Sequence, residues 1–148
     1  MHTRQRLWRA AAGVAALVAM LAGSQVSAQE PIKIGFAMSQ TGGLAPNGKS
    51  SLLGMKIWEE DINAKGGLLG RKVKLVYYDD QSTGSTVPGL YAKLLDVDKV
   101  DMIVAGYATG MIAPALPVAI QRKKVLLSLF GTGVNSEFKY DKYFSMIP

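Results

Sequence analysis

An eight-residue stretch at 43–50 has the spelling of a loop that binds nucleotide phosphates. It reads Gly-Leu-Ala-Pro-Asn-Gly-Lys-Ser, matches the pattern G-x-x-x-x-G-K-S/T, and lies between a predicted strand and a predicted helix. A P-loop nucleotide hydrolase would also use an Asp that ends an apolar strand, and Asp79 stands at such a place. Against this hypothesis, residues 39–42 separate the loop from its strand, and Pro46 lacks a backbone N–H that could contact phosphate. A glycine-rich entry into a helix is the alternative interpretation of the same residues.

Two acidic clusters resemble the paired carboxylates that catalyse hydrolysis or hold a metal. Glu59-Glu60-Asp61 lies on a predicted helix whose solvent face needs charge, and Asp79-Asp80 ends a predicted strand, where caps and turns are common. The chain has no cysteine, and its one histidine, His2, lies in the N-terminal export segment described below. After that segment, a thiol nucleophile, a histidine base and thiolate or imidazole metal ligation are therefore excluded. We expect no metal, no cofactor and no enzymatic activity.

Three loops follow the carboxyl ends of predicted parallel strands, which is where ligands of open α/β sheets bind. They span residues 40–48, 107–110 and 130–132. Backbone N–H groups at the helix start after the second loop favour a carboxylate or another electron-rich oxygen, and aromatic side chains can wall a pocket. Simpler roles also fit, since Thr109 could cap that helix and Phe130 could pack at a strand end. The candidate ligand-binding residues are Asn47, Tyr107, Thr109, Gly110, Phe130, Gly131 and Thr132.

Hydrophobic runs alternate with helical patterns along the chain, which predicts strand-helix units around a buried parallel sheet. Strands are predicted at 32–38, 73–78, 101–105 and 125–130, with a further extended segment at 143–147. The first helix follows a loop at 39–48 and ends at Gly66-Gly67. Its sheet-facing side is predicted to consist of Leu52, Met55, Trp58 and Ile62. Further helices are predicted at 86–95 and 111–121, so the fold class is α/β, a Rossmann-like open parallel sheet.

Residues 1–28 have the three parts of a secretory signal peptide in order. Arg4, Arg6 and Arg9 precede an apolar stretch at 10–22, and Val26-Ser27-Ala28 offers small residues for cleavage. The apolar stretch is shorter than the about 20 residues that span a bilayer, although an uncleaved anchor helix is the alternative. Without this segment, fourteen basic and eleven acidic residues leave a net charge of +3. We therefore expect a periplasmic protein without a nucleic-acid partner.

Residues 29–148 also resemble the periplasmic solute-binding proteins of branched-chain amino acid importers, often called Leu/Ile/Val-binding proteins. The most specific markers are Asn63-Ala64-Lys65-Gly66-Gly67 and, at the end of the second strand, Tyr78-Asp79-Asp80. More general markers are Ile32-Lys33-Ile34-Gly35, Thr41-Gly42, Val100-Asp101-Met102-Ile103-Val104-Ala105-Gly106 and Asn135-Ser136-Glu137-Phe138. The resemblance implies lobe one of a type I periplasmic binding protein, which closes on its ligand by a hinge motion. Because the chain stops after an extended segment, we expect residues 29–148 to be a fragment that reaches about the first crossover.

The resemblance also implies how the ligand is held. In this family, loops matching 107–110 and 131–133 bind the ligand's carboxylate through hydroxyl and backbone donors. This sequence departs from the pattern, because Ala108 stands where many members have serine and the segment at 131–135 is one residue longer than usual. The implied function is a receptor that delivers a small polar ligand, an amino acid or a related carboxylate or amide, to the membrane permease of an ABC importer. A sensor module of the same fold is the alternative.

Overall fold

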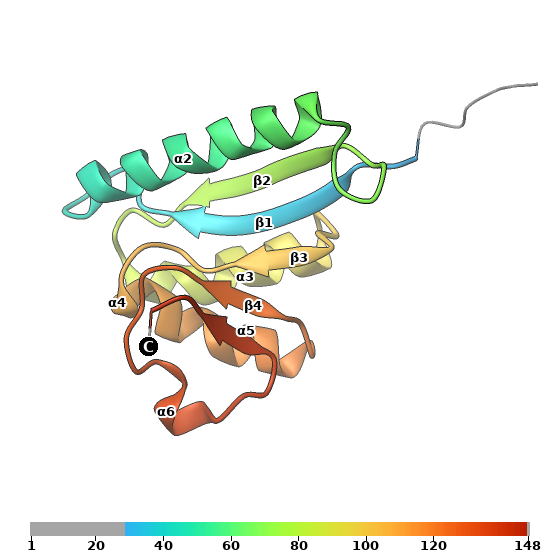
Figure 1. The fold of residues 1–148 in the computed structure, drawn as a ribbon. Coiled ribbons are helices and arrows are strands. Elements are labelled where there is room, and N and C mark those ends of the chain that lie inside the picture. Colours follow the sequence, from blue (N-terminus) through green and yellow to red (C-terminus); the bar gives the residue numbers. More distant parts are fainter. Residues whose placement is uncertain (1–28, 148) are drawn as a thin grey trace, which may run out of the picture.

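Five strands form one parallel sheet in the computed structural model of the chain, which describes residues 29–147 (Figure 1). The strands are β1 (Ile32–Met38), β2 (Val73–Asp79), β3 (Met102–Val104), β4 (Leu126–Ser128) and β5 (Tyr143–Ser145), in the order β2-β1-β3-β4-β5. All neighbouring strands pair in parallel, which confirms the predicted open parallel sheet. Their carboxyl ends therefore lie at one edge, together with the loops that follow them. The predicted signal peptide at 1–28 lies outside the described residues.

The helices occupy both faces of this sheet. They are α2 (Ala45–Ala64), α3 (Val87–Asp96), α4 (Thr109–Ile112), α5 (Leu116–Gln121) and α6 (Asn135–Phe138), with short 3₁₀ turns η1 (Gly84–Thr86) and η2 (Ala113–Ala115). The predicted helix at 111–121 is thus a succession of α4, η2 and α5. Pro114 and Pro117 lie in the first turns of η2 and α5. The backbone N–H groups of a first turn have no acceptor within the helix, so the N–H that proline lacks is not needed there. The sequence did not predict α6. Among the described residues, no helix is both long and apolar enough to cross a membrane.

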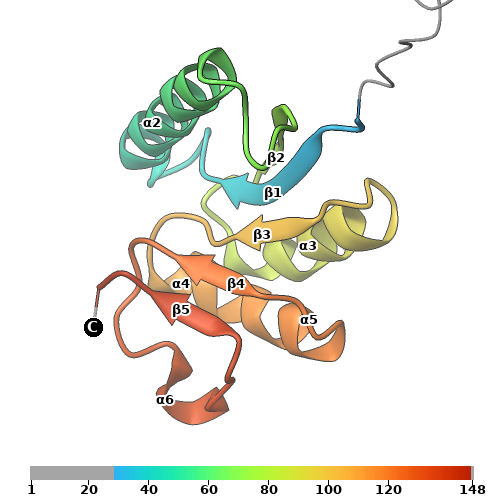
Figure 2. The ribbon, with the colours of Figure 1, turned by 45° about the vertical axis from the view of Figure 1, so that its right-hand side comes forward.

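The larger core lies between the sheet and the helices α3, α4 and α5, which share one face (Figures 1 and 2). Its fully buried side chains include Tyr91, Leu94, Ile103, Ile112, Leu116 and Leu126. The Tyr91 hydroxyl donates a hydrogen bond of 2.7 Å to the carbonyl of Val104, so the one polar atom of this side chain is satisfied. Burial raises the pKa of Tyr91 above its usual value, which keeps the hydroxyl protonated as a donor.

Within the described part of the chain, α2 is the one helix on the opposite face, and it covers β1 and β2 (Figure 2). The core here is smaller and includes Phe36, Met38, Leu52 and Leu75. Trp58, expected to face the sheet, is 37% exposed. Glu59, expected at the solvent face, accepts the N–H of Leu75 at 2.7 Å. Glu59 and Asn63, which makes two hydrogen bonds to Val73, satisfy the outer edge of β2 and protect it from pairing with another strand.

The start of α2 differs from the prediction, because residues 45–48 are helical and not part of a loop. Pro46 lies in the first turn, where its ring suits the helical backbone. Gly48 is buried against the end of β1, and a Cβ atom at this position would lie 1.9 Å from the carbonyl oxygen of Ser39. Because glycine has no Cβ atom, α2 can approach the end of β1 closely at this position. The sequence analysis placed Gly48 in a loop and did not predict this contact.

Candidate ligand-binding site

The loop between β1 and α2 is fastened to the neighbouring strand by Asp79. The Asp79 carboxylate accepts the N–H of Gln40 at 2.9 Å, and both the N–H and the hydroxyl of Thr41 at 3.2 and 2.7 Å. It also accepts the N–H of Gln81 at 2.9 Å. Burial by itself would raise the pKa of Asp79, but these hydrogen bonds outweigh it and lower the pKa to about 2. Asp79 therefore holds two of the strand-end loops together as a carboxylate.

The adjacent Asp80 is a buried residue that lies between the ends of β1, β2 and β3. Its side chain is fully buried, and Oδ1 accepts the Ser39 hydroxyl at 2.5 Å and the N–H of Ser82 at 2.9 Å. The other oxygen, Oδ2, has no hydrogen-bond partner among residues 29–147 and lies near Gly106, the second residue after the end of β3. The turn role expected for this acidic pair is thus confirmed by the bonds to Gln81 and Ser82, whereas neither carboxylate caps η1 or α3. The pair positions loops and does not line the pocket described next.

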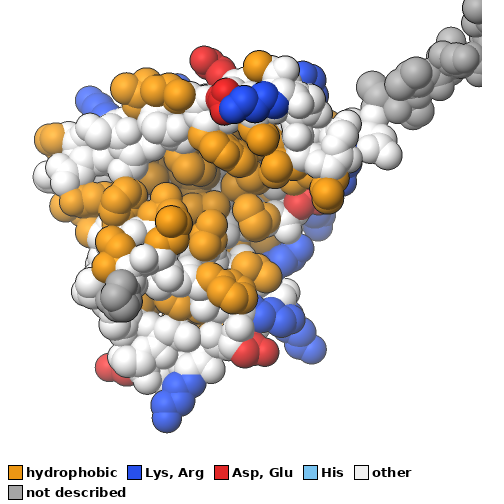
Figure 3. All heavy atoms as spheres, viewed as in Figure 1, with side chains coloured by type: hydrophobic (Ala, Val, Ile, Leu, Met, Phe, Trp, Pro, Cys, Tyr) orange, Lys and Arg blue, Asp and Glu red, His pale blue; other side chains and the backbone are white. Residues whose placement is uncertain are grey.

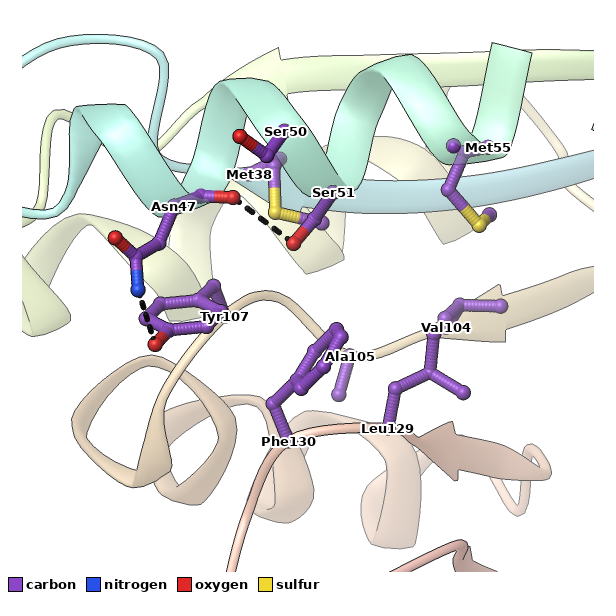
Figure 4. Close-up of a pocket in the computed structure, with 11 residues that line it drawn as sticks. Met38, Asn47, Ser50, Ser51, Met55, Val104, Ala105, Tyr107, Leu129 and Phe130 are labelled. Atoms are coloured by element: carbon purple, nitrogen blue, oxygen red, sulfur yellow. Dashed lines mark hydrogen bonds between the residues drawn. The ribbon is translucent and has the colours of Figure 1, made fainter. Parts of the chain in front are cut away.

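A cavity of about 830 Å³ lies beside α2, over the carboxyl ends of β1, β3 and β4 (Figure 4). Its wall on α2 contains Asn47, Ser50, Ser51, Gly54 and Met55, and its opposite wall contains Met38, Val104, Ala105, Tyr107, Leu129 and Phe130. No charged side chain from residues 29–147 is among those that line it. The space-filling view shows apolar side chains gathered around this hollow (Figure 3).

Three of the candidate residues meet in this cavity. The Asn47 side-chain amide donates a hydrogen bond of 2.5 Å to the hydroxyl of Tyr107. The ring of Tyr107 in turn contacts the ring of Phe130, with centroids 5.4 Å apart and planes tilted by 49°. Figure 4 shows these side chains converging from α2 and from the loops after β3 and β4. A hydrogen bond between residues 60 positions apart in the sequence thus joins the two walls.

The other four candidates lie at the same edge of the sheet but do not line the cavity. Thr109 and Gly110 are exposed at the start of α4, and Gly110 lies against Gly84 of η1. Thr132 is exposed, whereas Gly131 is buried and borders a smaller hollow of about 270 Å³ near β5. The backbone N–H groups of Thr109, Gly110 and Thr132 have no hydrogen-bond acceptor within residues 29–147.

The loop between β3 and α4 has an unusual backbone. Ala108 is the residue before α4 and has φ 72° and ψ 148°, a region that glycine adopts far more readily than alanine. No side chain caps this helix, so the simpler role of Thr109 as a cap does not apply. The strain at Ala108 is maintained by the surrounding packing and fixes the direction in which Tyr107 and Thr109 leave the strand.

Several lining residues were missed by the sequence analysis. Ser50, Ser51, Gly54 and Met55 line the cavity from α2, and Met38 and Leu129 lie at strand ends. A signal for the helical ones existed, because Asn47, Ser51 and Gly54 follow each other at helical spacing as a flank of small and polar residues. This spacing could be recognised as one side of a helix only after α2 was known to begin at Ala45.

The structure contradicts the phosphate-loop interpretation. Residues 45–48, which would have to wrap around phosphates, form the first turn of α2, and Lys49 is exposed on the helix. Within residues 29–147, no group of three or more His, Asp or Glu side chains is arranged to hold a metal ion. The remaining chemistry of the cavity is that of shape, apolar contact and a few uncharged hydrogen-bonding groups.

An open parallel sheet with an uncharged cavity at its strand ends defines a class of α/β ligand-binding lobes. Comparison with protein-family models makes the class specific, because residues 31–148 match the periplasmic binding protein family. The chain belongs to this family, as the resemblance implied. The members to which it is similar are binding proteins by name.

Individual relatives agree with this assignment. The chain is 34% identical to an amino acid binding protein of Pseudomonas aeruginosa over 107 residues, 72% of this chain and 29% of that protein. It is 33% identical to Leu/Ile/Val-binding protein homolog 7 of Brucella abortus over 72% of this chain and 26% of the relative. A solved structure, the branched-chain amino acid transporter substrate binding protein LivJ of Streptococcus pneumoniae with isoleucine, superposes with a TM-score of 0.73 at 27% identity. That match covers 78% of this chain and 33% of LivJ. The chain thus spans about a third or less of the length of these relatives.

Proposed function

We propose that this chain forms part of an extracytoplasmic receptor that captures a small polar ligand and delivers it to the permease of an ABC importer. The observation that carries the proposal is the uncharged cavity at the carboxyl ends of β1, β3 and β4, in which Asn47, Tyr107 and Phe130 meet. The eleven lining residues include no Asp, Glu, His, Lys or Arg, and no metal-binding cluster occurs within residues 29–147, which supports binding of a solute without transforming it. Family membership supports the same function and a periplasmic location.

In this proposal, different strand-end loops contact different parts of the ligand. The free N–H groups of Thr109, Gly110 and Thr132 donate to the acid or carbonyl end of the ligand, as helix starts and tight loops commonly do. Tyr107 and Phe130 form the wall against the ligand's body, Gly131 shapes the loop, and Asn47 borders the entrance. The relatives named above are amino acid binding proteins, which makes amino acids and related carboxylates or amides the first ligands to test.

Calorimetric titration of the full-length protein with a panel of amino acids, amides and small carboxylates tests this function. We expect at least one ligand to bind, and Tyr107→Ala to weaken its binding roughly tenfold or more, because a wall of the pocket and a hydrogen bond are lost together. Lys49→Ala is the control, since Lys49 is exposed on α2 outside the cavity and its loss leaves solute binding unchanged. Absence of binding across the whole panel would remove the proposal.

A further inference from the structure

We infer that the cavity selects ligands that carry a flat aromatic ring next to their carboxylate, in preference to aliphatic ligands of the same size. This inference rests on the proposed function and specifies the ligand class of that site. It comes from the side chains of this chain that line the cavity, whose chemistry suits a ring more closely than a branched aliphatic group.

The lining leaves the body of a ligand in apolar surroundings. Its hydrogen-bonding side chains are Asn47, Ser50, Ser51 and Tyr107, and no Lys, Arg, Asp or Glu is among the eleven lining residues. A charged group of the ligand is therefore expected at the mouth of the cavity and not deep within it. The part of the ligand that enters between α2 and the sheet is apolar.

The aromatic pair gives this apolar region a directional preference. The rings of Tyr107 and Phe130 are tilted by 49° at 5.4 Å, within the range that aromatic pairs favour. Phe130 is 41% exposed, so part of its ring is uncovered. A third ring placed there extends the pair with offset or edge-to-face contacts, which a saturated group of equal volume cannot make.

Two methionines on the facing walls support the same ligand class. Met38 comes from the end of β1 and Met55 from α2, and both side chains reach the cavity in Figure 4. Thioether sulfur makes favourable contacts with aromatic rings and adapts to their outline. Next to Met55, Gly54 lines the cavity without a side chain, and the space around it is open. The cavity thus combines Met38 and the two aromatic rings on one wall with Met55 and a glycine on the other.

The hydroxyl of Tyr107 supplies the polar contact that fixes the orientation of the ring. Its oxygen accepts a hydrogen bond from Asn47, so its own hydrogen is free to be donated. A carboxylate or a ring substituent of the ligand is a suitable acceptor at the sheet edge. An aromatic acid can therefore stack on Phe130 and accept from Tyr107 at the same time.

Matched pairs of ligands test the inference in the full-length protein. Benzoate is compared with cyclohexanecarboxylate, and phenylalanine with cyclohexylalanine, since each pair differs in the flatness and π-system of one ring. We expect the aromatic member of the pair that binds to have a dissociation constant roughly three- to tenfold lower. Phe130→Leu keeps apolar volume but removes the ring, and should reduce the ratio within that pair to about twofold or less.

Phe138→Leu is the matched control, because Phe138 is 39% exposed on α6 and lies outside the cavity. It should leave the ratio unchanged. Equal affinities within each pair, or a ratio that survives Phe130→Leu, would overturn the inference while leaving the receptor function intact. If no ligand of any class binds, the receptor function itself fails, so the two failures are distinguishable.

Discussion

The two faces of the sheet differ in how completely helices cover them. On one face, α3, α4 and α5 cover β1, β3 and β4 and bury a continuous core around Tyr91 and Leu116. On the other, α2 covers β1 and β2, and the cavity lies beside it over β3 and β4. Many apolar side chains of the covered face, such as Tyr91 and Leu116, are fully buried, whereas Phe130, Phe144 and Met146 at or after the ends of β4 and β5 are exposed.

This difference separates stability from binding. A filled core stabilises the fold through burial, and it offers no space to a ligand. A half-covered face contributes less burial, but its free apolar surface and its strand-end loops can enclose a small molecule. β3 and β4 pack against the core of the covered face, and this packing fixes the positions of the loops that contain Tyr107 and Phe130.

The largest expected effect contrasts one residue from each face. Leu116→Ala, in the covered core, should lower the free energy of unfolding by about 2–5 kcal/mol, because it removes buried methyl groups and leaves a void. Met55→Ala, on the half-buried cavity wall, should lower it by only about 1 kcal/mol. Urea denaturation of the full-length protein measures both. Ligand affinity should change in the reverse order, weakening for Met55→Ala and not for Leu116→Ala at temperatures where the protein is folded. Equal destabilisation by the two changes would contradict the division between the faces.

The covered face was the easier one to predict from the sequence. Hydrophobic runs such as 32–38 indicate buried strands, and their alternation with helical patterns indicates a parallel sheet. The boundaries were less accurate at β3 and β4, because apolar residues continue past the hydrogen-bonded part of each strand into the loops. The short α6 was missed, since four residues are too few to show a helical period.

The site was harder because it depends on contacts between distant parts of the chain. The position of Tyr107 and Phe130 after predicted strands placed them at the correct edge, as parallel topology requires. Their contact with each other and with Asn47 was not predictable, because it depends on α2 beginning at Ala45 and on the backbone of Ala108. Glu59 was assigned to solvent because an edge strand's need for hydrogen-bond partners does not appear in a helical pattern.

Two glycines of α2 provide a second contrast, between the closely packed and the open part of the half-covered face. Gly48→Ala should lower the free energy of unfolding by about 1–3 kcal/mol, because its Cβ atom would collide with the backbone of Ser39. Gly54→Ala should raise it by about 0.5–1 kcal/mol, since alanine favours a helix interior and the space around this position is open. Thermal and urea denaturation of the two variants measure the difference. A stabilising Gly48→Ala would show that α2 can shift away from β1, and the cavity wall would then not be fixed.

The smallest expected effect concerns the fastening of the loops at the cavity's edge. Hydrogen bonds lower the pKa of Asp79 to about 2, below the value near 3.8 of an unfolded chain. Its carboxylate therefore stabilises the fold fully above pH 4 or so, and this contribution disappears as the pH falls through about 2. Asp79→Asn should lower the free energy of unfolding by about 1–2 kcal/mol at neutral pH, and its difference from the unchanged protein should diminish between about pH 4 and 2. The control is Asp61→Asn, which removes an exposed pair with Lys65 and should change stability by less than about 0.5 kcal/mol. A difference for Asp79→Asn that is constant with pH would mean that the loops are held by groups other than this carboxylate.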